Sequence, residues 1–184
     1  MAKTGRFGFP FLIVEFDVAD SKPSAGSLEI ERQSDGQYIL TAKQRFAQSP
    51  ETLFPFFSEA RNLERITPPW LAFELLTPGP IEMGEGAQID YRLNLHGIPI
   101  RWRSRIAAWH PPHRFVDEQV KGPYKRWHHQ HILELDDAGG TTMIDRVTYA
   151  VPGGALIHNL LVGRDVRQIF LYRMARLKTL FGDG

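Results

Sequence analysis

The fold is indicated first by one stretch of sequence, residues 89–109, which reads IDYRLNLHGIPIRWRSRIAAW. Apolar and polar side chains alternate on both sides of His96-Gly97, and this period of two is typical of β-strands with one buried face. His96 and Gly97 suit the two central positions of a tight hairpin turn. We therefore predict two antiparallel strands, Ile89–Leu95 and Ile98–Trp109, joined by that turn.

The register of this hairpin assigns the inward face of both strands. A turn at residues 96–97 pairs Tyr91 with Trp102 and Leu93 with Ile100, so these apolar side chains share one face. Ser104 lies on the same face by alternation. The opposite, solvated face then carries an arginine stripe, namely Arg101, Arg103 and Arg105, which Asp90 and Glu118 on neighbouring strands would balance.

The rest of the chain supplies more strands and three helices. Further strands are predicted at Tyr38–Phe46, Phe73–Thr77, Phe115–Val120, Arg126–Leu135 and Thr142–Val151. Helices are predicted at Glu51–Phe57, Glu59–Ile66 and Ala155–Phe181. Strands joined by short turns must be antiparallel, and the last helix, roughly 40 Å long, must bury its apolar stripe against them. We predict an α+β fold: a curved antiparallel sheet wrapped around a long C-terminal helix, with two short helices after the first strand.

The long helix has a predicted inner and outer side. Helical spacing predicts a buried stripe formed by Leu156, Leu160, Val166, Phe170, Met174, Leu177 and Phe181. The arginines of this segment, including Arg173, are interpreted as solvent-facing.

Extending the register across the remaining turns gives the inward face a polar centre. Ile106 is predicted near Asp117, Ala108 near Phe115, and Gln119 opposite Trp127. Asp117 is predicted opposite His129, and His131 opposite Asp145. The inward face then carries Asp117, Gln119, His129, His131, Asp145 and Tyr149 among Tyr91, Trp102, Phe115, Trp127 and Leu133. Polar groups beside aromatic rings, under a covering helix, indicate a pocket that orients an amphipathic small molecule.

Each candidate residue has a structural as well as a functional interpretation. His129 and His131 suit a proton-transfer pair held by Asp117 or Asp145, but a histidine–aspartate network that shapes the core is favoured somewhat more. Two histidines with one of these aspartates could also ligate a metal, yet the aspartates are equally explained as histidine partners, so no metal is expected. Trp70 is either a cavity lid or ordinary packing.

Composition excludes several classes of protein. The 184 residues suit one domain, and their formal net charge is +1, which gives no global reason to bind nucleic acid or an anionic membrane. The chain has no cysteine, so disulfides and thiolate chemistry are absent, which suits the cytoplasm. No apolar run is long enough to span a bilayer.

The N-terminal part differs from the remainder. Residues 1–36 are predicted to be a loosely ordered arm, and residues 37–184 a ligand-binding domain. Lys3 and Arg6 precede an apolar run at Phe7–Val14, but Pro10 interrupts this run. We therefore favour a cytoplasmic protein over an exported one.

Several motifs are similar to those of the SRPBCC superfamily, which contains START, Bet v 1-like and polyketide cyclase/dehydrase proteins. They are Ser49-Pro50-Glu51-x-Leu53-Phe54, Asn62-Leu63-x-x-Ile66-Thr67-Pro68-Pro69 and Gly97-x-Pro99-x-Arg101-Trp102. The stretches Arg114–Gln119, Gly122–Tyr124, Trp127-x-His129-x-His131 and Asp145-x-Val147-x-Tyr149 resemble its bacterial cyclase/dehydrase-like branch. The resemblance covers about Tyr38–Phe181. It implies a helix-grip fold with a hydrophobic cavity between sheet and helix.

Three functions remain open at this point. The first is binding of a small hydrophobic or amphipathic molecule through Tyr91, Trp102, Ser104, Phe115, Gln119, Trp127, Tyr149 and Trp70. The second is a cofactor-independent cyclase, dehydratase or isomerase that uses His129, His131, Asp117 and Asp145 for catalysis. The third is a regulatory or interaction protein with a vestigial cavity. No cofactor, nucleic acid or membrane insertion is expected, and homodimerisation is left open.

Overall fold

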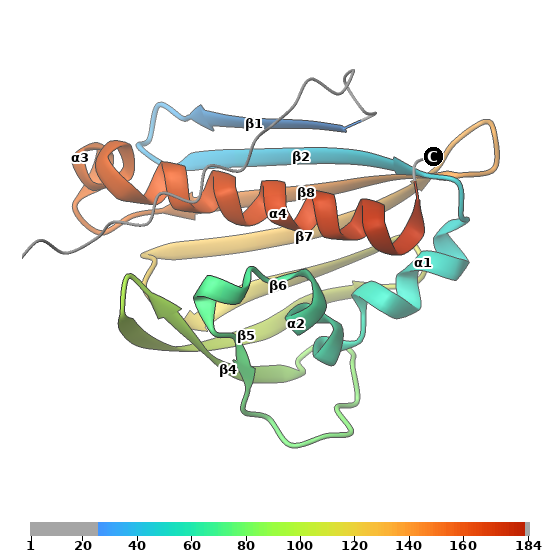
Figure 1. Ribbon diagram of the computed structural model, residues 1–184, viewed down its shortest axis with the longest axis horizontal. Helices are drawn as coiled ribbons and strands as arrows, with labels where there is room; N and C mark the ends of the chain where they lie inside the picture. The colour runs from blue at the N-terminus through green and yellow to red at the C-terminus, as the bar shows by residue number, and fades with distance from the viewer. Residues whose placement is uncertain (1–25, 183–184) are drawn as a thin grey trace, which may run out of the picture.

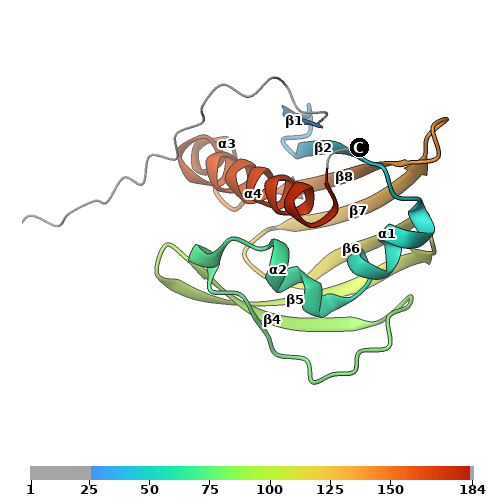
Figure 2. The ribbon, with the colours of Figure 1, turned by 45° about the vertical axis from the view of Figure 1, so that its right-hand side comes forward.

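The concave side of a single antiparallel sheet holds one long helix (Figure 1). The computed structural model describes residues 26–182. Its sheet has eight strands in the order β1-β2-β8-β7-β6-β5-β4-β3, so the strand before the helices lies beside the last strand. Turned by 45°, the sheet is seen to curve beneath the helix (Figure 2). These features confirm the predicted α+β, helix-grip architecture.

The strands are β1 (Gly26–Arg32), β2 (Tyr38–Phe46), β3 (Glu74–Leu75), β4 (Gln88–Leu95), β5 (Ile98–His110), β6 (Arg114–Lys121), β7 (Arg126–Leu135) and β8 (Thr141–Ala150). The helices are α1 (Pro50–Phe57), α2 (Leu63–Ile66), α3 (Gly154–Ile157) and α4 (Gly163–Phe181). Short 3₁₀ turns lie at Ala60–Asn62 and Pro69–Leu71, and a π-helical turn at His158–Val162 joins α3 to α4. None of the helices within residues 26–182 is long and apolar enough to cross a membrane.

The β4–β5 hairpin has the register that its alternation predicts. Tyr91 pairs with Trp102, and Leu93 pairs with Ile100. At the turn, His96 and Gly97 have φ values of 52° and 84°, both in the left-handed region that a two-residue hairpin turn of the mirror-image type requires. This tight connection fixes which face of both strands points toward the helix.

A β-bulge in β5 changes one predicted pair. Ile106 lies opposite Asp117, as expected, but the register then shifts, and Ala108 pairs with Val116 while Trp109 pairs with Phe115. The extra residue in a bulge turns the following side chains to the other face. Trp109 therefore packs edge-on against Phe54 of α1, a contact that strict alternation could not predict.

The C-terminal helix buries a narrower stripe than its apolar pattern predicts. Val166, Phe170, Arg173 and Leu177 of α4 are buried, whereas Leu156 and Leu160 are 68% and 65% exposed. The π-helical turn that joins α3 to α4 has more residues per turn than an α-helix. The spacing that places the buried residues of α4 on one side therefore does not continue through this turn into α3. The buried stripe of the C-terminal segment therefore belongs mainly to α4.

Part of the predicted N-terminal arm is a strand of the sheet. Gly26–Arg32 form β1, which pairs along its whole length with β2. Leu28 and Ile30 are half-buried against the apolar cluster under α4, which explains why this segment joins the edge. Residues 1–25, with the apolar run Phe7–Val14, lie outside the described residues.

Candidate functional site

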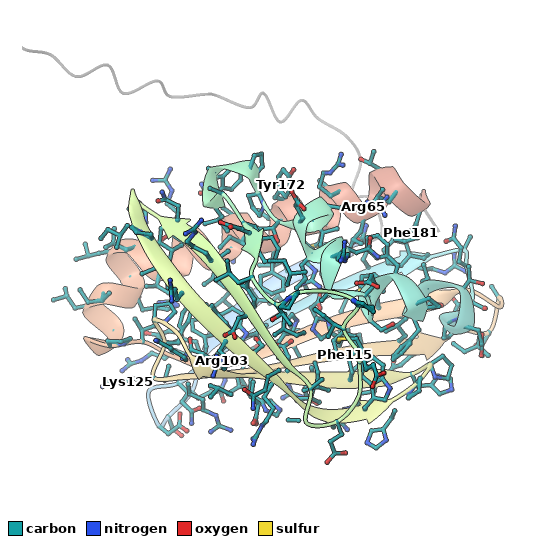
Figure 3. The ribbon with its side chains drawn as sticks, turned by 90° about the horizontal axis from the view of Figure 1, so that it is seen from below. Arg65, Arg103, Phe115, Lys125, Tyr172 and Phe181 are labelled. Atoms are coloured by element: carbon teal, nitrogen blue, oxygen red, sulfur yellow. The ribbon has the colours of Figure 1, made fainter. Side chains whose placement is uncertain are left out.

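A cavity of about 160 Å³ lies between the concave face of the sheet and α4. Most of its wall is apolar or aromatic. This wall comes from β4 (Ile89, Tyr91), β5 (Trp102, Ile106), β6 (Phe115), β7 (Trp127), and α4 (Val166, Ile169, Phe170). Figure 3 views the molecule from the side of β4, with Tyr172 and Arg65 on the helix layer and Phe115 on the sheet layer.

Part of the wall is polar and charged. Asp117, His129, His131 and Arg173 line the cavity there, and Asp145 lies directly behind them. Their side chains are almost fully enclosed: the exposed fraction is 17% for Asp117 and 4–10% for the others. Buried charges are costly unless they are paired, so this polar cluster must be internally matched.

Each histidine of the polar cluster contacts both aspartates. His129 Nε2 lies 2.9 Å from Asp145 Oδ1, and His129 Nδ1 lies 3.5 Å from Asp117 Oδ2. His131 Nε2 lies 2.9 Å from Asp117 Oδ2, and His131 Nδ1 lies 3.1 Å from Asp145 Oδ1. Arg173 Nε is 3.7 Å from the second oxygen of Asp145. The predicted pairings of Asp117 with His129 and of His131 with Asp145 are confirmed by the strand register.

The two histidines have pKa values displaced in opposite directions. Burial, reinforced by the nearby His131, lowers the pKa of His129 to about 4. Burial also opposes a charge on His131, but its contacts with Asp117 and Asp145 outweigh burial and raise its pKa. His129 is therefore neutral near neutral pH, and His131 is the imidazole that holds a second proton more readily.

Both carboxyl groups stay ionised despite their burial. Burial favours the neutral form of Asp145, but Arg173 and the hydrogen bonds with the histidines hold its pKa well below the usual range. Burial likewise opposes the charge on Asp117, and the hydrogen bond from His131 outweighs it, so the pKa of Asp117 is also lowered. The charges of the polar cluster thus stabilise one another.

A short polar chain links the aromatic wall to the cluster. Trp102 donates its indole N–H to Ser104 Oγ at 3.1 Å, and Ser104 Oγ donates to Asp117 Oδ1 at 3.4 Å. The Tyr91 hydroxyl lies 3.3 Å from the same Ser104 oxygen. Among the predicted binding residues, five line the cavity: Tyr91, Trp102, Ser104, Phe115 and Trp127.

Three predicted binding residues lie elsewhere. The β6–β7 ladder ends at Glu118–His128, so Gln119 does not pair with Trp127 and instead hydrogen-bonds both backbone groups of Tyr124 in the next loop. Tyr149 is buried beyond the cavity, with its hydroxyl 2.9 Å from His158 Nε2. Trp70 is 55% exposed, packs edge-on against Tyr172 on α4 and does not line the cavity.

Arg173 is the residue of the site that sequence reasoning missed. Its charge suggested solvent exposure, yet the residue is only 9% exposed and faces the cavity. A signal was present, because position 173 continues the helical spacing of Val166, Phe170 and Leu177. An arginine within an apolar stripe indicates a buried acidic partner, which here is Asp145.

One group of side chains has the composition of a metal site. Within residues 26–182, Asp117, His129 and His131 are the set of potential ligands whose donor atoms all lie within 4.8 Å of one another. Nitrogen and oxygen donors of this kind suit zinc and other first-row divalent metals.

Comparison with solved structures supports the fold. No family model matches this sequence, and no curated protein matches it. Protein Ms6760 of Mycobacterium smegmatis shares 16% identity over 84% of this chain and 97% of its own, with a TM-score of 0.59. The Zhui aromatase/cyclase of Streptomyces sp. R1128 shares 13% identity over 76% of this chain and 90% of its own, with a TM-score of 0.60.

Ara h 8.0201 has a TM-score of 0.57, with 15% identity over 79% of this chain and 97% of its own. At these identities the likeness concerns the fold alone. It confirms the helix-grip fold that the sequence motifs implied.

Proposed function

We propose that this protein binds a small, largely apolar molecule that has one polar or anionic end. The observation that supports this proposal is the composition of the cavity wall, which is mostly aromatic and aliphatic and includes one charged group, Asp117, His129, His131 and Arg173. An apolar wall with a few convergent polar groups is the usual composition of small-molecule sites. Among the solved structures of the same fold is an aromatase/cyclase, which fits a ligand with aromatic or ring-forming character.

The cavity volume restricts the size of the ligand. An engineered apolar cavity of about 150 Å³ binds benzene, so a cavity of about 160 Å³ suits a molecule with roughly one aromatic ring and a short polar substituent. A larger ligand would require outward movement of the wall. Aromatic acids, phenols and cyclic ketones combine a suitable size with an oxygen that the polar cluster could contact.

The proposed orientation follows from the polar cluster. The ring of the ligand would lie among Trp102, Ile106 and Phe115, and its oxygen would point toward His131 and Arg173. Arg173 and His131 would donate hydrogen bonds to that oxygen, and the ionised carboxylate of Asp117 would accept one from a hydroxyl group of the ligand.

A thermal-shift and titration screen of single-ring acids, phenols and ketones tests this proposal. Binding should weaken at least about tenfold in Trp127→Ala and in His129→Ala, because each change removes a wall group that excludes water or orients the polar end. Ile98→Ala is the matched control, since Ile98 lies on β5 but is 62% exposed and does not line the cavity. Unchanged affinity in both wall variants would reject this site.

A second proposed function is proton transfer on a bound carbon acid. His129 and His131 line the cavity, and an aspartate oxygen lies near each of their four ring nitrogens. The longest of these contacts, 3.5 Å, is at His129 Nδ1, so this nitrogen is the one that would exchange a proton with a ligand while Asp145 orients the ring through Nε2. The test is hydrogen–deuterium exchange at the acidic C–H of bound cyclic ketones in heavy water. Catalysed exchange that is lost in His129→Gln but retained in His128→Gln supports this function, and exchange at the uncatalysed rate rejects it.

A further inference from the structure

The polar cluster has a geometric asymmetry between its two carboxylates. Asp145 Oδ1 lies 2.9 Å from His129 Nε2 and 3.1 Å from His131 Nδ1, so it contacts one nitrogen of each ring. Asp117 Oδ2 faces the two remaining nitrogens, His129 Nδ1 at 3.5 Å and His131 Nε2 at 2.9 Å. Because Asp117 lines the cavity and Asp145 does not, the polar cluster has a cavity side and a supporting side.

Lone pairs converge on the cavity side. His129 Nε2 hydrogen-bonds Asp145, so His129 Nδ1 is an electron-pair donor that faces Asp117 Oδ2. His131 Nε2 hydrogen-bonds Asp117 Oδ2, and loss of that proton would make this nitrogen a second electron-pair donor facing the same oxygen. Three such donors repel one another unless a positive species lies between them. A proton on His131 Nε2 satisfies only the 2.9 Å contact, whereas a metal ion would satisfy all three donors.

We propose that Asp117 Oδ2, His129 Nδ1 and His131 Nε2 form a binding site for a divalent transition metal, best suited to Zn²⁺. Ligand atoms about 2.0–2.2 Å from a tetrahedral zinc lie roughly 3.3–3.6 Å apart. The 3.5 Å separation of His129 Nδ1 and Asp117 Oδ2 already has this value. The 2.9 Å separation of His131 Nε2 and Asp117 Oδ2 would open by a few tenths of an ångström once the proton leaves.

Asp145 and Arg173 supply the support that such a site needs. Metal-bound histidines generally direct their second nitrogen toward a carboxylate or carbonyl, which fixes the tautomer and the ring orientation. Asp145 hydrogen-bonds the second nitrogen of His129, lies 3.1 Å from that of His131, and is itself beside Arg173. The sequence pattern left each aspartate open as ligand or partner, and the geometry assigns Asp117 as ligand and Asp145 as partner.

The charges indicate what would complete the coordination. Two carboxylates and one guanidinium sum to −1, so a divalent ion brings the polar cluster to +1. An anionic oxygen, either hydroxide or a carboxylate, phenolate or enolate, would neutralise this charge from the cavity side. This class of donor matches the anionic end of the ligand in the proposed function, but metal binding does not depend on that function.

Equilibrium dialysis of untagged, chelator-treated protein with Zn²⁺ alone tests the site, together with the visible spectrum after addition of Co²⁺. We expect one ion per chain and the intense visible bands of four- or five-coordinate Co²⁺. Asp117→Asn and His131→Gln should each weaken Zn²⁺ binding by more than about 100-fold, and Asp145→Asn by about 10–100-fold. His128→Gln, on the outer face of the same strand, should leave binding unchanged.

Two results would overturn the metal site: no saturable Zn²⁺ binding by the wild-type protein, or undiminished binding by folded Asp117→Asn and His131→Gln variants. If a variant does not fold, X-ray absorption of the wild-type Co²⁺ protein decides instead. Two imidazoles with oxygen donors in the first shell support the site, and an all-oxygen shell rejects it. Because no organic ligand is added, these results are independent of the ligand screen.

Discussion

The two faces of strands β6 and β7 carry the same kinds of residue in different surroundings. On the outer face, His128 Nδ1 lies 2.9 Å from Glu118 Oε1, and Arg105 lies 3.2 Å from the same carboxylate. On the inner face, the polar cluster pairs His129 and His131 with aspartates at similar distances. The outer side chains are 25–52% exposed, whereas the inner ones are 4–17% exposed.

Similar histidine–carboxylate contacts contribute differently to stability on the two faces, because only the inner ones are buried. The outer pairs are hydrated and screened by salt, so each contributes about 0–1 kcal/mol. On the inner face each charge depends on its partners, because the loss of one leaves another uncompensated in a poorly hydrated environment. Burial lowers the pKa of His129, whereas the contacts of His131 with Asp117 and Asp145 outweigh burial and raise the pKa of His131. The inner face therefore has chemical properties that the outer face lacks.

The largest expected effect is the loss of Asp145. Asp145→Ala removes the carboxylate that contacts both buried histidines and Arg173, and should lower the free energy of unfolding by about 3–5 kcal/mol. Urea denaturation followed by circular dichroism measures this change. The matched outer-face variant, Glu118→Ala, should cost no more than about 1 kcal/mol. Equal losses in the two variants would refute the comparison.

A smaller effect is expected from the apolar wall. Ile106 is 1% exposed and lines the cavity, whereas Ile98 on the same strand is 62% exposed. Ile106→Ala should lower the free energy of unfolding by about 2–4 kcal/mol, because it removes buried methyl groups and enlarges a cavity. Ile98→Ala should change it by no more than about 0.5 kcal/mol. The same urea titrations measure both, and a small loss in Ile106→Ala would indicate that the wall collapses around the gap.

A third histidine, His158, is expected to make the stability of the protein depend on pH. Burial lowers the pKa of His158, opposed in part by a hydrogen bond with Asn159. The His158 ring also stacks on Tyr38 and hydrogen-bonds the Tyr149 hydroxyl. As pH falls below the ordinary value of 6.5, the unfolded chain takes up a proton that the folded chain resists, so stability falls.

His158→Phe should abolish this contribution. We expect the difference between the melting temperatures at pH 7.5 and pH 5.5 to be smaller in His158→Phe than in the wild-type protein. The melting temperatures are measured by differential scanning calorimetry at constant ionic strength. An identical difference in the two proteins would show that His158 is not a source of acid sensitivity.

The smallest effect is expected on the outer face. His128→Ala should change the free energy of unfolding by about 0–1 kcal/mol, and this difference should shrink further in 1 M salt, because an exposed pair is screened. Urea titrations at low and high salt measure it. A loss above about 2 kcal/mol would mean that the outer pair is coupled to the core and that the two faces do not differ as described.

Local alternation was sufficient to predict most of the sheet. The pairings Tyr91–Trp102, Asp117–His129 and His131–Asp145 all follow from tight turns and period-two patterns, and all are present. This succeeded because a shift of one residue would expose a whole apolar face. The inward polar centre could therefore be predicted before its geometry was known.

The errors arise where tertiary packing overrides the local pattern. The bulge after Ile106 and the pairing of Gly26–Arg32 with β2 depend on contacts between segments distant in sequence. Arg173 was missed because a charged residue on a helix is usually solvated, and only Asp145, on another element, explains its burial. Trp70 and Tyr149 suit a pocket by residue type, but their positions beyond its walls follow from how the helices pack.

The central claim is that the cavity holds a small apolar molecule with its polar end at the polar cluster. The most direct test is a crystal structure with the tightest single-ring ligand from the screen. The ring should lie between Phe115 and Ile106, with an oxygen within hydrogen-bonding distance, about 2.7–3.2 Å, of His131 or Arg173, or bound to a metal held by Asp117. A ligand bound outside the sheet–helix cavity, or one whose apolar end faces the polar cluster, would contradict the account.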